Sequence, residues 1–159
     1  MKRVFFAATM ALMACGPAMP GDELRGAWRV DILATLPASA RQNVVSFLAT
    51  VRFDANYTYV MTAQATSTTT APQTPGCLTE LESSGGTWSA STLNNVNTLV
   101  TAGTVMGTIQ RTGCRNATDN FARRPAAAGE ILGLEGGNYT VMGSTLILTS
   151  GSNTVTFMR

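Results

Sequence analysis

The chain has 159 residues, with 11 basic and 9 acidic side chains and no histidine. Lys2 and Arg3 belong to the N-terminal signal described below, so the rest of the chain is formally neutral. This balance excludes a basic field that would attract nucleic acid. The lack of histidine removes the commonest general base and metal ligand. We therefore expect a protein that is not an enzyme and that has no cofactor, no metal and no nucleic-acid partner.

The first 14 residues have the pattern of a signal peptide. Lys2 and Arg3 are followed by an apolar run over 4–13, which is too short to span a bilayer as a helix, because that needs about 20 residues. The end of this run and the two residues after it, Leu12-Met13-Ala14-Cys15, resemble the lipobox of bacterial lipoproteins. The resemblance implies that Cys15 is acylated and anchors the chain in the cell envelope. The alternative is a secreted protein that is cut after Gly16 and loses Cys15.

The residue after the acylated cysteine also bears on localisation. Gly16 is not the Asp that retains lipoproteins in the inner membrane of enteric bacteria, so the resemblance implies the outer membrane. Residues 15–23 form a Pro- and Gly-containing tether, and the segment from Gly16 to Glu23 reaches only ~20–25 Å when fully extended. Residues 24–159 then form one domain of ordinary size. Its frequent Thr and Gly favour strands and turns.

Alternation of apolar and polar residues predicts the first strands of the domain. Trp28, Val30 and Ile32 alternate with Arg29 and Asp31, which is typical of a half-buried strand over 26–32. A turn of helix follows at 37–42. Two longer alternating runs, over 45–53 and 57–64, flank a turn and predict a hairpin. The low-complexity stretch 66–76 predicts an exposed loop.

The second half of the domain shows weaker patterns and more glycine. We expect strands over 77–83 and from 87 onwards, separated by a turn at Ser84-Gly85-Gly86. Residues 98–111 predict one strand broken or bulged at Gly103 or Gly107, or two short strands. Residues 115–137 predict a long loop with one helical turn in 126–132. The last strands are expected over 138–142, 145–149 and 154–157.

Two cysteines remain besides Cys15. In an oxidising envelope, Cys77 and Cys114 predict one disulfide. On the loop-entropy model this crosslink stabilises the fold by about 3–4 kcal/mol. The alternative is two separate buried thiols. A metal site is disfavoured, because two thiols without histidine make a poor ligand set.

About eight antiparallel strands in sequence order predict an up-and-down β-barrel, with a two-sheet β-sandwich as the alternative. The opening Gly26-Ala27-Trp28 resembles the lipocalin-like lipoproteins, which begin with a Gly-x-Trp strand. Tyr139-Thr140-Val141, Gly143, Leu146, Leu148 and a terminal Arg extend the resemblance. It implies that an Arg near the last strand packs over the Gly-x-Trp tryptophan, and the matching positions are Trp28 and Arg159.

Six aromatic side chains are candidates either for lining a ligand cavity or for filling a closed core, and a solid core is favoured because small barrels can be packed throughout. They are Trp28, Phe47, Phe53, Tyr57, Tyr59 and Trp88. Glu80 and Glu82 share a strand face at ~7 Å, which is typical of a solvated face rather than of a pair of catalytic carboxylates.

Two kinds of function fit these expectations. The first is a membrane-anchored lipoprotein whose barrel binds a small hydrophobic ligand or a lipid. The second is a structural lipoprotein with a solid barrel, which binds another envelope protein through its loops.

Overall fold

The computed structural model describes residues 19–35, 41, 44–68, 75–131 and 133–159. The expected signal peptide, Cys15 and most of the helical turn expected at 37–42 lie outside this part. The described strands are β1 (Gly26–Asp31), β2 (Val44–Phe53), β3 (Thr58–Thr68), β4 (Pro75–Leu93), β5 (Val96–Ala102), β6 (Met106–Thr112), β7 (Phe121–Pro125), β8 (Gly137–Met142), β9 (Thr145–Ser150) and β10 (Asn153–Met158). The short 3-10 helices are η1 (Asp22–Leu24), η2 (Ile32–Thr35), η3 (Ala117–Asp119) and η4 (Ala128–Glu130).

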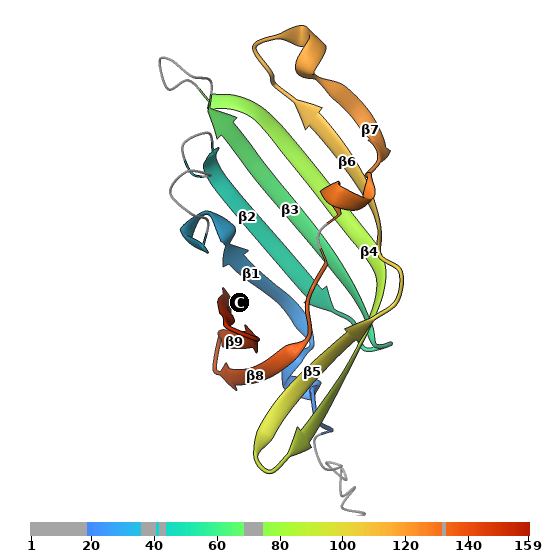
Figure 1. Ribbon diagram of the computed structural model, residues 1–159, viewed down its shortest axis with the longest axis vertical. Coiled ribbons are helices and arrows are strands. Elements are labelled where there is room, and N and C mark those ends of the chain that lie inside the picture. Colours follow the sequence, from blue (N-terminus) through green and yellow to red (C-terminus); the bar gives the residue numbers. More distant parts are fainter. Residues whose placement is uncertain (1–18, 36–40, 42–43, 69–74, 132) are drawn as a thin grey trace, which may run out of the picture.

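Eight of these strands close an antiparallel barrel. The order around the ring is β1-β2-β3-β4-β5-β8-β9-β10, and β10 returns to β1 through the pair Arg29 and Met158. Strands β6 and β7 lie outside the ring and continue the sheet from β4 (Figure 1). The expected barrel is confirmed, and the two-sheet sandwich is not the architecture. The closed barrel is compatible with a lipocalin-like fold.

Strand β4 is the longest element and belongs to both parts of the molecule. Its first half pairs with β3 on one edge and with β6 on the other, and its second half pairs with β5. The turn expected at Ser84-Gly85-Gly86 is therefore wrong: these residues continue β4. The glycines instead accompany a register shift opposite Tyr59 and Met61, and a bulge of this kind bends a strand without ending it.

The barrel is closed at one end and splayed at the other because its strands differ in length. Strands β2 and β3 have 10 and 11 residues, whereas β8, β9 and β10 have 6 each. Figure 1 shows β2, β3 and β4 rising well above β8 and β9. We call the end with the β2–β3, β4–β5 and β8–β9 turns the closed end, and the opposite end the open end.

The closed half is packed solid with large side chains. Trp28 is 0% exposed, and Phe53 and Trp88 of the same core meet edge to face with ring centroids 5.4 Å apart. Leu24 of η1 is also fully buried, and its carbonyl oxygen accepts a 2.6 Å hydrogen bond from the Trp28 Nε1–H. The segment that leads into β1 thus packs across the closed end and is held there by the Leu24–Trp28 hydrogen bond.

The remaining local expectations are met in part. The 98–111 segment is interrupted after Ala102 and resumes at Met106, so it forms two strands on either side of Gly103. The helical turn expected in 126–132 is η4.

Strand β7 was not expected, because Arg123-Arg124-Pro125 does not have a strand pattern. Among the described strands it pairs with β6 alone, and such an edge position tolerates proline.

Candidate binding site at the open end of the barrel

An open hollow of about 640 Å³ lies at the open end of the barrel. Val30 lines it from the end of β1, Ile32 from the start of η2, Met61 from β3, and Leu148 and Val155 from the β9–β10 hairpin. Residues 133–135 pass beside it, and serines and Asn153 of the hairpin turn supply polar groups. The wall is thus mostly aliphatic, with polar atoms near the hairpin turn.

The hollow follows from the alternation of the short strands. Leu148 and Val155 are register partners on β9 and β10, and Leu146 and Phe157 form the next inward pair down the same hairpin. Leu146 and Phe157 are buried in the packed core, whereas Val155 is only half-buried. The inward-facing side chains of the β9–β10 hairpin therefore run from the packed core up to the hollow. Beyond the end of this hairpin, the longer β2 and β3 continue without a strand opposite them.

A smaller hollow of about 210 Å³ continues along the inner face of the raised sheet. Phe47, Ala65, Leu81 and Ile109 give it an apolar floor, and Arg111 stands at its edge. The Arg111 Nε–H donates a 3.1 Å hydrogen bond to Thr79 Oγ1. This inner face therefore combines an apolar surface with a cation at its margin.

Two charges near this margin, Arg124 and Glu130, are paired with each other. Arg124 donates two 2.8 Å hydrogen bonds to the carboxylate of Glu130, and the backbone N–H of Ala127 donates another. The Arg124 bonds, followed by the Ala127 bond, lower the pKa of Glu130 to about 2. The guanidinium groups of Arg111 and Arg124 also lie 5.4 and 4.6 Å from the Phe121 ring centroid. Together these contacts fix β7 and η4 beside the smaller hollow.

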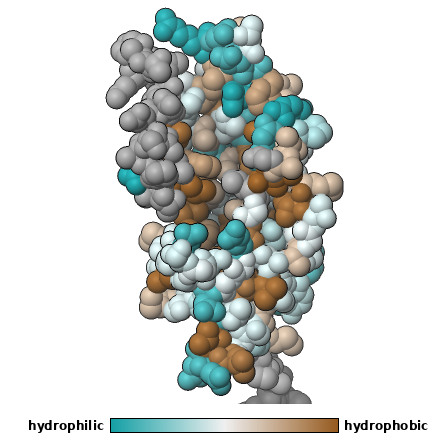
Figure 2. Space-filling model, viewed as in Figure 1, coloured by the Kyte–Doolittle hydropathy of each residue, from teal (hydrophilic) through white to brown (hydrophobic). Residues whose placement is uncertain are grey.

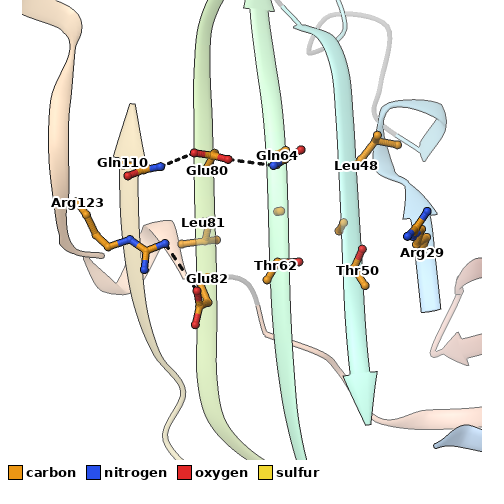
Figure 3. Close-up of a pocket in the computed structure, with 12 residues that line it drawn as sticks. Arg29, Leu48, Thr50, Thr62, Gln64, Glu80, Leu81, Glu82, Gln110 and Arg123 are labelled. Carbon is orange, nitrogen blue, oxygen red and sulfur yellow. Dashed lines mark hydrogen bonds and ion pairs between the residues drawn. The ribbon is translucent and has the colours of Figure 1, made fainter. Parts of the chain in front are cut away.

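The outer face of the same sheet carries a polar hollow of about 530 Å³ (Figure 3). Glu80 lies between two amides: Gln64 Nε2 donates to one carboxylate oxygen at 3.0 Å, and Gln110 Nε2 donates to the other. Glu82 forms an ion pair with Arg123 at 3.7 Å. These carboxylates lie on an outward face and accept from amide or guanidinium groups, as a solvated strand face predicts.

The expected aromatic residues separate into three environments. Trp28, Phe53, Tyr59 and Trp88 belong to the buried core, and Phe47 is half-buried in the smaller hollow. Tyr57 does not continue the β3 alternation. It has a φ of 63° in the β2–β3 turn and is exposed, and its ring centroid lies 5.3 Å from that of Trp88. None of the four core aromatics lines the larger hollow.

The structure brings together the two residues of the expected Trp–Arg pair. The guanidinium carbon of Arg159 lies 4.1 Å from the centroid of the Trp28 ring. Its Nη2 donates 2.7 Å hydrogen bonds to the carbonyl oxygens of Glu23 and Arg25. Arg159 thereby holds the segment before β1 against the closed end.

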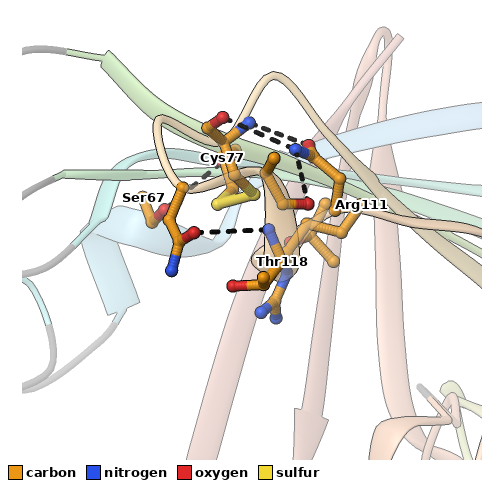
Figure 4. Close-up of a disulfide and its surroundings, with 9 residues drawn as sticks. Ser67, Cys77, Arg111 and Thr118 are labelled. Atoms are coloured by element: carbon orange, nitrogen blue, oxygen red, sulfur yellow. Dashed lines mark hydrogen bonds between the residues drawn. A yellow bond between two sulfur atoms is a disulfide. The ribbon is translucent and has the colours of Figure 1, made fainter.

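The expected disulfide between Cys77 and Cys114 is confirmed, with Cα atoms 4.2 Å apart (Figure 4). It joins the start of β4 to the segment that follows β6. The two strands are already register partners at Leu78 and Thr112. The crosslink therefore fixes the outer sheet extension to the barrel strand that carries it.

The residues that line the larger hollow were missed by the sequence reasoning. Val30, Ile32 and Val155 stand in alternating strands, and the alternation says only that they point inward. Whether an inward side chain meets a partner or a hollow depends on the relative lengths of distant strands. Among the described residues, no group of three potential metal ligands occurs and no helix is long and apolar enough to cross a bilayer.

Searches of protein-family models, of characterised proteins and of solved structures find no match for this chain. The class is therefore defined by the fold and the hollow alone. The chain forms an eight-stranded antiparallel barrel that is solid at its closed end and hollow at its open end.

Proposed function

We propose that the chain is a lipid-anchored lipoprotein of a bacterial cell envelope, and that its barrel holds a small hydrophobic ligand in the larger hollow. The observation that carries the binding role is the hollow of about 640 Å³. Pockets for small molecules have roughly 300–1,000 Å³ and are lined mainly by apolar groups with a few polar ones. The lining of Val30, Ile32, Met61, Leu148 and Val155 has this character.

The chemistry of the wall selects the class of ligand. Glu135 is the charged residue that lines the hollow in the described part of the chain, and the polar groups nearby are hydroxyls and an amide. An aliphatic wall disfavours binding of a charged molecule, because the charge of the ligand would lose its hydration without gaining a partner. The ligand is therefore a mostly aliphatic molecule, such as a lipid in transit, with a neutral polar group near the β9–β10 turn.

Native mass spectrometry tests the binding role. The acylated protein is released from membranes in detergent and weighed with its bound molecules intact, and an added mass beyond the anchor is expected. Val155→Phe fills the hollow and should abolish the added mass. Thr156→Phe is the matched control, because Thr156 is the adjacent, exposed residue on β10. A wild-type protein without any bound molecule after exposure to envelope lipids contradicts the proposal.

The lipid anchor is the second part of the proposal. It rests on Leu12-Met13-Ala14-Cys15, with Gly16 favouring the outer membrane. Two or three acyl chains on Cys15 give stable attachment, since each buried methylene contributes about 0.8 kcal/mol. Replacing Cys15 with Ala should abolish incorporation of labelled palmitate and release the protein from the membrane fraction. Unchanged incorporation in that variant rules the anchor out.

We also propose that the domain is lipocalin-like. Three features support the assignment: the order of the eight ring strands, the η1 segment across the closed end, and Arg159 over Trp28. The proposal assigns no catalytic role.

A second candidate is a lipoprotein that binds another envelope protein. The polar outer-face hollow favours it, because Thr62, Glu80 and Glu82 present an ordered row of polar groups there. A photo-crosslinking residue at Thr62, with one at Thr156 as the control, tests this candidate in cells. A crosslinked protein specific to Thr62 supports it, and equal patterns at both positions reject it.

A further inference from the structure

Large apolar side chains gather on the surface of the closed end. Leu93 and Val96 flank the β4–β5 turn, and Met142 and Met158 lie on either side of Thr145 at the β8–β9 turn. All four are exposed, with Leu93 at 73%. Met19 and Tyr57, also exposed, belong to the N-terminal segment and to the β2–β3 turn of the same end. An apolar cluster of this kind marks an interaction surface.

The β4–β5 hairpin projects furthest from this end. Strand β3 begins at Thr58, which is the register partner of Thr87, so the rest of β4 continues beyond it with β5. The hairpin turns through Asn94 and Asn95, whose φ angles of 51° and 62° match the tight turns that close hairpins. Leu93 and Val96 stand opposite each other at this tip. Figure 2 shows apolar surface at the lower tip of the molecule, where Figure 1 places this hairpin.

The tip is free of charge over a long stretch. Residues 83–110, which include the whole of β5 and the second half of β4, contain no Asp, Glu, Lys or Arg. A surface that enters the interface of a bilayer needs such a stretch, because each ionised group carried out of water is costly. The tip presents hydroxyls, amides and aliphatic side chains, which the interface accepts.

Most charges at the closed end have a polar or charged partner, and Arg159 lies over the Trp28 ring and donates to two carbonyl oxygens. Asp22 and Arg25 form an ion pair at 3.2 Å, and Arg52 and Asp54 form another at 3.0 Å. The Tyr139 hydroxyl donates a 2.7 Å hydrogen bond to Glu23. Paired groups lose less on approaching a surface of low polarity than isolated ones do.

The described chain begins beside the same β4–β5 hairpin. Gly21 packs against the hairpin so closely that a Cβ on it would lie 2.7 Å from the Ala90 Cβ. Cys15 precedes Met19 by only four residues, which can span at most ~15 Å at ~3.3–3.6 Å per residue. An acylated Cys15 therefore brings the bilayer within reach of the closed end.

We propose that the closed end is a membrane-docking surface and that Leu93 and Val96 at the β4–β5 tip enter the interface of the bilayer that holds the anchor. The inference rests on the lipid anchor proposed above. It gives the barrel a fixed orientation: the closed end lies on the membrane, and the mouth of the larger hollow faces away from it.

Fluorescence of a polarity-sensitive label tests the docking. The full acylated chain carries Leu93→Cys, labelled with nitrobenzoxadiazole at the new thiol. This thiol reacts selectively, because Cys77 and Cys114 are joined and Cys15 is blocked by its thioether. The protein is reconstituted in phosphatidylethanolamine–phosphatidylglycerol vesicles, with and without doxyl-labelled lipid. Leu48→Cys is the matched control, since Leu48 is 54% exposed on the outer face of β2, away from the tip. Val96→Cys provides a second reporter at the tip.

Mass spectrometry of each sample first establishes acylation of Cys15. In acylated protein, we expect emission from the tip labels to shift to shorter wavelength and to be quenched by the doxyl lipid, with the Leu48 label unaffected. Acylated protein whose tip and control labels respond equally overturns the docking and leaves the anchor standing. A chain that carries no acyl group overturns the anchor, and the docking with it.

Discussion

Arg159 covers the face of Trp28 and at the same time holds the backbone that leads into the Trp28 strand. Its guanidinium carbon lies 4.1 Å from the ring centroid, and its Nη2 donates to two carbonyl oxygens of the segment 23–25. The last residue of the sequence thus closes the barrel against the first strand. The Arg159 side chain thus joins the end of the last strand to a segment more than 130 residues earlier in the sequence.

Replacing Arg159 with Ala should lower the free energy of unfolding by about 1–2 kcal/mol. A cation over an indole contributes about 0.5–2 kcal/mol, and two hydrogen bonds from a charged donor add to it, but the guanidinium is exposed and solvent weakens both. Urea unfolding measures the change. Arg115→Ala replaces an exposed loop arginine and should alter stability by less than about 0.5 kcal/mol. Equal effects of the two substitutions would contradict this role of Arg159.

The Cys77–Cys114 crosslink should stabilise the fold by about 3–4 kcal/mol, because it closes a long loop in the unfolded chain. The double replacement of Cys77 and Cys114 with Ser is expected to lower the midpoint of urea unfolding accordingly. Alkylation of the unfolded protein before reduction should modify neither residue, and alkylation after reduction should modify both. Two alkylated thiols before reduction would show that the crosslink is absent from the protein.

Gly86→Ala should destabilise the fold by about 1–3 kcal/mol, the usual range for overpacking a core. A Cβ at Gly86 would clash with the ring of Tyr59, which is 2% exposed and cannot move aside without displacing its neighbours. Gly133→Ala is the control, since a Cβ there meets nothing within 4 Å. Combining Gly86→Ala with Tyr59→Val should recover part of the loss, and strict additivity in this double-mutant cycle would exclude the clash as its cause.

The stability of the fold should fall at alkaline pH through Tyr139. Burial raises the pKa of Tyr139, and the hydrogen bond to the Glu23 carboxylate raises it further. Tyrosine in an unfolded chain ionises near pH ~10. The folded state therefore keeps a proton that the unfolded state loses, so the contribution is complete below about pH 10 and declines as the pH rises above it.

Urea unfolding at several pH values between ~9 and ~11 measures this effect. Tyr139→Phe has no phenol to ionise, so its stability should decline less steeply than that of the wild type over the same range. Glu23→Gln keeps a hydrogen-bond acceptor but removes the charge, and an intermediate slope is expected. Parallel slopes for wild type and Tyr139→Phe would mean that another group controls the alkaline loss.

The barrel could be predicted because its inward residues repeat every second position. Trp28 and Val30 in β1, and Tyr59 and Met61 in β3, follow that period, and the disulfide followed from the two remaining cysteines. The course of β4 could not be predicted in this way. Gly85 and Gly86 have the composition of a turn, but the ladder to β3 continues across them, from Ser83 opposite Met61 to Thr87 opposite Thr58. Pairing with β3 outweighed the local preference.

The larger hollow was beyond the reach of local patterns for a different reason. Val155 and Phe157 have the same period and the same apolar character and both border the hollow, yet Phe157 is buried in the core and Val155 is only half-buried. The difference arises because the β9–β10 hairpin ends at Ser150 and Asn153, well short of the far ends of β2 and β3. Such differences depend on strands distant in sequence.

The larger hollow shares part of its wall with the core, and this limits how the wall can vary. Val30, Met61 and Leu148 border the hollow and are also buried in the core, whereas Ile32 and Val155 are only partly buried. Replacing a buried residue with a smaller one removes packed contacts and lowers stability, whereas a change at Ile32 or Val155 removes fewer of them. Sequence variation around the hollow is therefore expected to concentrate at its partly buried positions.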